Sequence, residues 1–184
     1  MALSEDVRQH LEQEALRIAE DSNYSGRGHL QAAIPWSRVH LFLQMTIVLL
    51  SAGSGMLALI WGERGDTYIV WAGVLALLAA LLAGISASLK AEQRANLHLQ
   101  AGNEYLALKN NVRLYREIVL LTGTVASELI RELTHLSTER DAINRRSPQI
   151  PGWAYKRAKK GIEQGQTDYG VDKPRPPSAT GSTT

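Results

Sequence analysis

The chain of 184 residues contains no cysteine, and this absence excludes several classes of protein. Without thiols there is no disulfide scaffold, no thiolate zinc or iron–sulfur site and no cysteine nucleophile. An excess of charge of one sign is also missing, because 20 Lys and Arg stand against 18 Asp and Glu and leave a net charge of +2. The sequence pI near 9.0 therefore does not indicate a nucleic-acid partner. The length fits one ordinary domain, or a domain with tails.

Motifs that carry chemistry are missing as well. Ser25 to Gly28 is not a phosphate-binding loop, because such a loop needs Gly-Lys-Ser/Thr at the start of a helix. The histidines show no i, i+4 pair and no carboxylate cluster that would complete a metal site. They are dispersed at His10, His29, His40, His98 and His135. We expect no enzyme, no catalytic residue, no metal and no cofactor.

Two long runs lack Asp, Glu, Lys and Arg, at residues 39–62 and 67–89. As helices, at 1.5 Å per residue, they reach about 35 Å, enough to cross a hydrocarbon core of about 30 Å. The four residues from Glu63 to Asp66 leave room only for an antiparallel hairpin. The alternative, two buried helices of a soluble bundle, needs a large polar shell that the rest of the chain does not supply. We therefore expect an all-α membrane protein: a two-span transmembrane helical hairpin with a cytoplasmic helical bundle or coiled-coil region.

Basic residues near the runs lie mainly on the side of the two termini. The loop carries only Arg64. The positive-inside bias therefore predicts that both termini are cytoplasmic. Because polar-rich residues 1–38 come first, the first run is not typical of a cleavable signal peptide. We expect a multi-pass protein of the cell inner membrane with the lipid bilayer as partner. The basic residues on the terminal side are Arg27, Arg38, Lys90, Arg94 and Lys109.

Small residues share one helical face of the second run. Small side chains let helix backbones approach closely in lipid, so this helix-packing stripe predicts association of helices and a homo-oligomer. The stripe consists of Gly73, Ala76, Ala80, Gly84 and Ala87.

The first run has a polar face, on which His40, Gln44, Ser51 and Ser54 fall within about 100° of one another. Polar groups inside lipid usually face a bundle interior or a water-filled path, which makes these four residues candidates for lining a pore. In the alternative, His40 and Gln44 lie at the headgroup level and the serines bond back to their own helix.

Residues 1–22 are predicted to form an amphipathic helix, with Ser4 as N-cap and Glu5 and Asp6 in its first turn. Its apolar residues recur at three-to-four spacing. Residues 23–38 are predicted to be a juxtamembrane loop, because Ser25 to Gly28 are typical loop residues and Pro35 with Trp36 marks entry to the membrane interface.

Residues 90–146 carry the heptad spacing of cytoplasmic helices. No helix breaker follows Leu89 for a long stretch, so the second span should run unbroken into a long helix. The pattern is interrupted at Thr122 and Gly123 and resumes until Ser147. A turn at Gly123 gives a helical hairpin and no turn gives one stalk; we favour the turn. The apolar seam before the interruption is Leu97, Ala101, Tyr105, Leu108, Val112, Tyr115 and Val119.

Residues 151–164 are predicted to be a basic amphipathic helix that begins at Pro151. A tryptophan beside basic residues can bind an anionic membrane surface, whereas the alternative is a helix that packs back on the bundle with solvated lysines. Residues 165–184 are rich in Gly, Pro, Ser and Thr and are expected to be disordered. The candidates for membrane-surface contact are Trp153, Lys156, Arg157, Lys159 and Lys160.

The order of these segments resembles the SLATT domains, the two-transmembrane effectors associated with SMODS nucleotidyltransferases and SLOG proteins in bacterial conflict systems. The resemblance covers the chain from the first helix to about Ile162 and includes the stretch from His98 to Leu108. Gly102 departs from the small helix former expected at its position. The positions that match the family motifs are His98, Tyr105, Pro148, Pro151 and Tyr155.

This resemblance implies a function: such domains are thought to oligomerise and to form a pore or breach in the membrane when a partner detects infection, often through a nucleotide messenger. The expectation is therefore an anti-phage effector whose partner is a nucleotidyltransferase or a nucleotide-sensing protein. The alternative is a membrane-anchored coiled-coil adaptor or scaffold without a pore. The polar face of the first run favours the effector.

Overall fold

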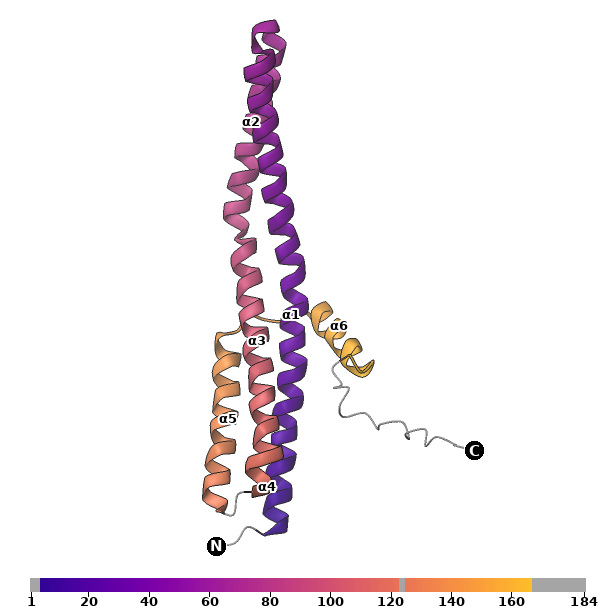
Figure 1. Cartoon of the computed structure of the whole chain (residues 1–184), viewed down its shortest axis with the longest axis vertical. Coiled ribbons are helices and arrows are strands. Elements are labelled where there is room, and N and C mark those ends of the chain that lie inside the picture. Colours follow the sequence, from indigo (N-terminus) through magenta and orange to yellow (C-terminus); the bar gives the residue numbers. More distant parts are fainter. Residues whose placement is uncertain (1–3, 123–124, 167–184) are drawn as a thin grey trace, which may run out of the picture.

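A computed structural model of the chain describes residues 4–122 and 125–166, and every regular element in these ranges is a helix. Figure 1 shows a long column, with a two-helix hairpin at one end and a bundle at the other. The prediction of an all-α chain is confirmed. Apart from residues 165 and 166, the segment predicted to be disordered lies outside the described residues. The elements are α1 (Glu5–Met56), a π-helical turn η1 (Leu57–Trp61), a 3-10 turn η2 (Gly62–Arg64), α2 (Asp66–Leu89), α3 (Ala91–Leu114), a π-helical turn η3 (Tyr115–Val119), α4 (Leu120–Thr122), α5 (Ala126–Arg146) and α6 (Gly152–Glu163).

The hairpin consists of the second half of α1 and of α2, joined by η1 and η2 (Figure 1). Both helices are long and apolar enough to cross a membrane, and their most apolar 18-residue windows are 0% and 11% buried. Large side chains such as Phe42, Leu49 and Leu59 are 71%, 66% and 86% exposed. A core helix of a soluble protein would be covered, so this surface has the character of one that faces lipid.

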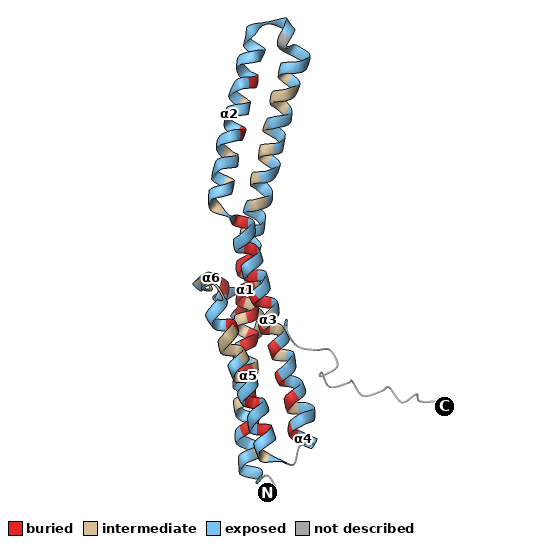
Figure 2. Ribbon diagram, turned by 90° about the vertical axis from the view of Figure 1, so that its left-hand side faces the viewer, coloured by how far each residue is buried: buried red, intermediate tan, exposed pale blue. Residues whose placement is uncertain are grey.

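The bundle is built by the first half of α1 together with α3 and α5, and its core combines part of the apolar seam with buried residues of α1 and α5 (Figure 2). Helix α1 begins as predicted, because the Val7 amide donates a hydrogen bond to Ser4 Oγ at 3.4 Å. The prediction that Leu97 and Val119 belong to the buried seam is wrong, since they are 44% and 39% exposed. The buried core residues are Leu11, Ala15 and Ile18 of α1, Tyr105, Leu108 and Val112 of α3, Tyr115 of η3, Leu120 of α4, and Leu129, Leu133, Leu136 and Ile143 of α5.

Helix α5 folds back along α3, so the chain forms a helical hairpin and not one stalk (Figure 1). The Tyr115 hydroxyl donates a hydrogen bond to the carbonyl of Leu129 at 3.1 Å. Farther along the pair, Arg146 forms an ion pair with Glu104 at 2.7 Å. The turn favoured from sequence is therefore confirmed, although Gly123 itself lies outside the described residues.

The prediction of a juxtamembrane loop at residues 23–38 is wrong, because α1 continues through it from Glu5 to Met56 with Pro35 inside the helix. Gly26 and Gly28, which were interpreted as loop residues, instead allow close packing of helices. A Cβ on Gly26 would lie 3.1 Å from the carbonyl oxygen of Gly102 on α3, and one on Gly28 would lie 3.2 Å from the Ile150 side chain. Tertiary contacts here override the low helix propensity of glycine.

The prediction that the second span runs unbroken into the following helix is also wrong. Lys90 lies between α2 and α3 in the left-handed conformation, with φ 49° and ψ 40°. A left-handed residue ends one helix and redirects the chain, and the ribbon bends at this point (Figure 2). The bend allows α3 to join α1 closely while α2 continues as the second arm of the hairpin.

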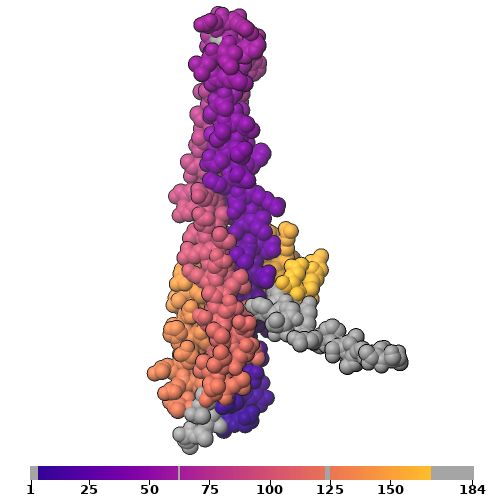
Figure 3. Space-filling model, in the orientation of Figure 1, coloured from indigo at the N-terminus to yellow at the C-terminus, as the bar shows by residue number. Residues whose placement is uncertain are grey.

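Helix α6 packs on the side of α1 through the buried Ala154 and Ala158, with the Tyr155 ring 6.1 Å from that of Tyr24. In the space-filling view α6 protrudes from the column beside the bundle (Figure 3). This is the arrangement in which the helix packs back on the bundle. Trp153 is 48% exposed, and the basic side chains Lys156, Arg157, Lys159 and Lys160 are exposed. Their binding to a membrane surface stays a prediction.

The close approach of α1 and α3 predicts that a large side chain at Gly102 destabilises the bundle. A Cβ there would lie 2.8 Å from Leu30 Cδ2 and 3.1 Å from the Gly26 carbonyl oxygen. Gly102→Leu should therefore lower the free energy of unfolding by about 1–3 kcal/mol, despite the higher helix propensity of leucine. Thermal unfolding of the full chain in detergent, followed by circular dichroism, measures the change.

The matched control is Ala107→Leu, which adds bulk at an exposed position of the same helix. It should leave stability nearly unchanged. Equal stability of the two variants would contradict a tight contact between the backbones of α1 and α3.

Candidate functional site

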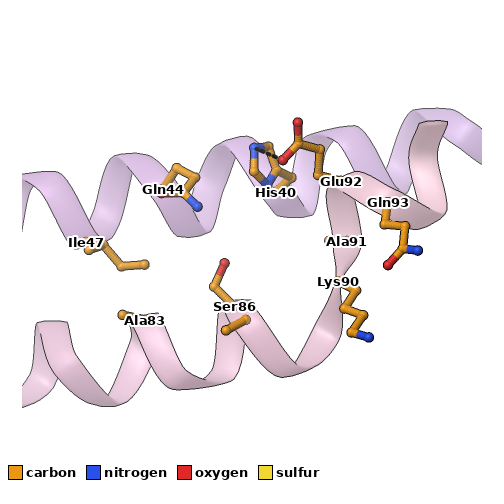
Figure 4. Close-up of a pocket in the computed structure, with 10 residues that line it drawn as sticks. His40, Gln44, Ile47, Ala83, Ser86, Lys90, Ala91, Glu92 and Gln93 are labelled. Carbon is orange, nitrogen blue, oxygen red and sulfur yellow. Dashed lines mark ion pairs between the residues drawn. The ribbon is translucent and has the colours of Figure 1, made fainter.

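A polar cleft of about 400 Å³ lies between α1 and α2, at the end of the hairpin nearest the bundle. Figure 4 shows His40, Gln44 and Ile47 projecting from α1, with the Ser86 hydroxyl pointing toward α1 from the facing helix. Two of the four candidates for pore lining, His40 and Gln44, therefore share this cleft. The remaining lining residues are Ala83, Ala87, Lys90, Ala91, Glu92 and Gln93.

The bend at Lys90 places the start of α3 at the mouth of this cleft. His40 Nε2 lies 3.8 Å from a carboxylate oxygen of Glu92, an ion pair that forms when the imidazole is protonated (Figure 4). An imidazole, two amides, a hydroxyl and a lysine thus converge beside an apolar hairpin. Such a set of groups can hold water or a hydrated ion at the edge of a membrane.

The two serines of the predicted polar face are used differently from His40 and Gln44. Ser54 Oγ donates a hydrogen bond of 2.8 Å to the carbonyl oxygen of Ala72 on α2, so this serine joins the two arms of the hairpin. Ser51 is exposed on the surface of α1. Exposure to a water-filled path in an assembly stays a prediction for these residues.

The helix-packing stripe of α2 is not covered by α1, although one member, Ala87, lines the polar cleft between the two helices. All five members, Gly73, Ala76, Ala80, Gly84 and Ala87, are exposed, whereas the buried residues of α2 are Ala72 and Ala79. A Cβ added at Gly73 or Gly84 would meet no atom within 4 Å. The contact within the hairpin therefore leaves the stripe open.

Two histidines form a buried pair where α1 packs on α3. The Nδ1 atoms of His29 and His98 lie 3.0 Å apart, and the residues are only 2% and 6% exposed. The Tyr105 ring stacks on His29 with ring centres 5.7 Å apart. In the neutral pair, the Nδ1–H of one imidazole can donate a hydrogen bond to the Nδ1 of the other.

Sequence reasoning missed this pair, because it treated the histidines as dispersed. The two residues are far apart in the chain, and only the pairing of α1 with α3 brings them together. The one available signal was the resemblance, which singled out His98 and Tyr105 without suggesting His29. Within the described ranges no group of three or more His, Cys, Asp or Glu side chains could hold a metal ion.

The pair is held neutral by its surroundings. Burial, and next the neighbouring His98, lower the pKa of His29 from its ordinary value of 6.5 to about 4. Burial also lowers the pKa of His98. Both effects disfavour a charged imidazole inside the bundle.

The other positions that match the family motifs surround the segment between α5 and α6. Pro148 and Pro151 line a cavity of about 310 Å³ together with Trp36, Arg94 and His98. Tyr155 lies on α6 against Tyr24. The motif residues are therefore gathered along the contact of α1 with its neighbours, below the hairpin.

No protein-family model, no curated protein and no solved structure matches the chain. The likeness to SLATT domains therefore rests on the order of segments and on the motif residues named above.

The lowered pKa values predict that the protein loses stability in mild acid. His29 titrates near 6.5 when unfolded and near 4 when folded, so between these values the unfolded state binds more protons. The free energy of unfolding should fall by on the order of 3 kcal/mol as the pH drops from 6.5 to 4. Thermal unfolding in detergent at a series of pH values measures this loss.

His29→Phe removes the main titrating group and keeps an aromatic ring beside Tyr105, so it should reduce the pH-dependent loss by more than half. His135→Phe, at an exposed position, is the matched control and should leave the loss intact. An unchanged slope in His29→Phe would show that the pair is not the source.

Proposed function

We propose that the chain is a two-transmembrane effector of a bacterial conflict system, which assembles as a homo-oligomer and forms a pore or breach in the inner membrane. A nucleotidyltransferase or a nucleotide-sensing protein would supply the trigger. The observation that carries this proposal is the continuity of α1, which belongs both to the bundle and to the apolar hairpin. A helix shared in this way transmits a displacement of the bundle directly to the membrane segment.

Three features support membrane action over a simple scaffold. The hairpin surface is uncovered and apolar. The stripe on α2 is open for a second copy. The polar cleft supplies His40 and Gln44 at the end of the hairpin nearest the bundle. The biological setting, defence against phage, comes from the resemblance to SLATT domains.

The second candidate is a membrane-anchored coiled-coil adaptor without a pore. One contact favours it, the hydrogen bond from Ser54 to Ala72, which ties the arms of the hairpin together and uses a polar group proposed to face water. In this role the bundle would dock a soluble partner and the hairpin would only hold it at the membrane.

Topology is the first property to test. A reporter fused after Thr184 should be active only as a cytoplasmic fusion, and one inserted at Gly65 only as an exported fusion, because the basic residues lie on the side of the termini. The reversed pattern would contradict the proposed orientation.

Assembly through the stripe predicts that Gly73→Leu weakens association in membranes. Nothing lies within 4 Å of a Cβ at this position, so the larger side chain leaves the single chain undisturbed and holds neighbouring chains apart. Chemical cross-linking in membranes should show several-fold less oligomer. The control Leu77→Met changes a 73% exposed side chain of α2 outside the stripe. Unchanged cross-linking in Gly73→Leu would mean that the stripe faces lipid.

Cysteine labelling distinguishes the effector from the adaptor, since the natural chain has no thiol. Ser51→Cys and Leu49→Cys are a matched pair, because both positions are exposed in the single chain. They differ only in the proposed assembly, where Ser51 faces water and Leu49 faces lipid. In vesicles that the protein permeabilises, Ser51→Cys should react with a soluble thiol reagent and Leu49→Cys should be protected by lipid. Protection of both during permeabilisation would contradict a path along this face; an inserted protein that leaks nothing would favour the adaptor.

A further inference from the structure

A groove of about 650 Å³ lies where the end of α2 meets α3, and it shares no lining residue with the polar cleft. Its wall is the end of α2, and one side chain of α3, Arg94, closes it on the side of the bundle. The wall is mainly apolar, so the groove combines a hydrocarbon-like surface with a single cation at one end. We call it the Arg94 groove, and it is lined by Ala80, Leu81, Gly84, Ile85, Ser88, Leu89 and Arg94.

With the hairpin inserted in a bilayer, Arg94 would lie at the level where lipid headgroups begin. It follows the last residue of α2 by five positions, which corresponds to about 7 Å along a helix, the thickness of one headgroup layer. Its guanidinium lies 4.8 Å from the centre of the Trp36 ring on α1. Tryptophan is the residue typical of this interface, and the cation–π contact holds the arginine in place.

The charge of Arg94 is not neutralised by the chain. Among residues 4–122 and 125–166 no carboxylate forms an ion pair with it, whereas Arg116, Arg140 and Arg146 each have an acidic partner. A guanidinium offers paired N–H donors that fit a phosphate. The exposed Lys90 adds a second positive charge at the bend.

We propose that the Arg94 groove binds one anionic phospholipid, with its phosphate against the Arg94 guanidinium and one acyl chain along the outer surface of α2. The volume is in the range of sites for small molecules, about 300–1,000 Å³. Because the chain bends between α2 and α3, a straight helix of a second copy packed on α2 would not follow the groove to Arg94, whereas a flexible acyl chain with a phosphate can. The groove takes only Ala80 and Gly84 from the helix-packing stripe and leaves Gly73 and Ala76 for a second copy. The lipid site rests on insertion of the hairpin, and pore formation is not required.

The preference for anionic lipid is the quantity to measure. Full-length protein is reconstituted in phosphatidylcholine vesicles that contain a trace of spin-labelled phosphatidylglycerol or spin-labelled phosphatidylcholine. Electron paramagnetic resonance gives the fraction of each lipid that the protein immobilises. The natural chain should prefer phosphatidylglycerol about fivefold, as expected for one basic residue at the surface, and Arg94→Gln should bring the ratio close to one.

Arg38→Gln is the matched control, because it removes the same charge from an exposed position of α1 at the same end of the hairpin. It should keep most of the preference. An equal loss of lipid preference in both variants would overturn the proposal and indicate diffuse electrostatic attraction. An unchanged preference in Arg94→Gln would also overturn it.

A steric variant separates lipid from a second copy as the occupant. Ser88→Leu adds bulk at an exposed lining position outside the helix-packing stripe and should reduce immobilisation of both lipids, with cross-linking unchanged. Reduced cross-linking with normal lipid immobilisation would assign the groove to another copy and overturn the proposal.

Extraction of the same vesicles with alkaline carbonate separates failure of this proposal from failure of the proposed function. Retention in the vesicles without a lipid preference contradicts the lipid site alone. Release by alkali contradicts insertion of the hairpin and, with it, both proposals.

Discussion

The contact of α1 with α3 holds the molecule together, and it depends on glycine. Gly26 and Gly102 face each other across this contact, where a Cβ on either would lie 3.1 Å from the other's carbonyl oxygen. This approach brings the buried imidazoles of His29 and His98 within hydrogen-bonding distance, with their Nδ1 atoms 3.0 Å apart. Glycine costs about 1 kcal/mol in a helix interior, and the packing gained along the two helices offsets that cost. Helix α1 continues unbroken past this contact into the hairpin.

The bend at Lys90 produces two different surfaces from one backbone change. On the inner side, between the arms of the hairpin, the polar residues around His40 form a cleft. Where α2 meets α3, the end of α2 and Arg94 form an apolar groove with a cation at its edge. Both lie at the end of the hairpin nearest the bundle, where a membrane would change from hydrocarbon to headgroup. Any motion of α3 against α1 therefore changes the cleft and the groove together.

The sequence was sufficient for what depends on composition and periodicity. Long runs without charge predicted the hairpin helices, and the heptad spacing predicted much of the bundle core, including Tyr105 and Leu108. Prediction from the sequence failed where one residue type serves two structural purposes. Gly26 and Gly28 were interpreted as loop residues, although in a helix the lack of a side chain also permits close packing. Lys90 gave no signal, because a lysine rarely adopts the left-handed conformation that the bend requires.

The candidate site was less predictable than the fold, because it depends on which helices meet. The alignment of His40 and Gln44 on one face was visible from the spacing, but the partners Ser86 and Glu92 depend on the facing helix. The sequence also did not show that α1 leaves the helix-packing stripe uncovered, since a face of small residues does not tell which neighbour it contacts. The pairing of His29 with His98 required the register of α1 against α3.

The proposed coupling of bundle and membrane requires that α1 be one rigid helix through residues 23–38. Spin labels at Glu20→Cys and Leu49→Cys, both at exposed positions of a chain without other thiols, allow a direct distance measurement in vesicles by double electron–electron resonance. At 1.5 Å per residue a continuous helix gives a single narrow distribution centred at about 44 Å. A broad distribution, or one centred at a clearly shorter distance, would mean that the chain bends between bundle and hairpin and that α1 cannot carry a displacement from one to the other.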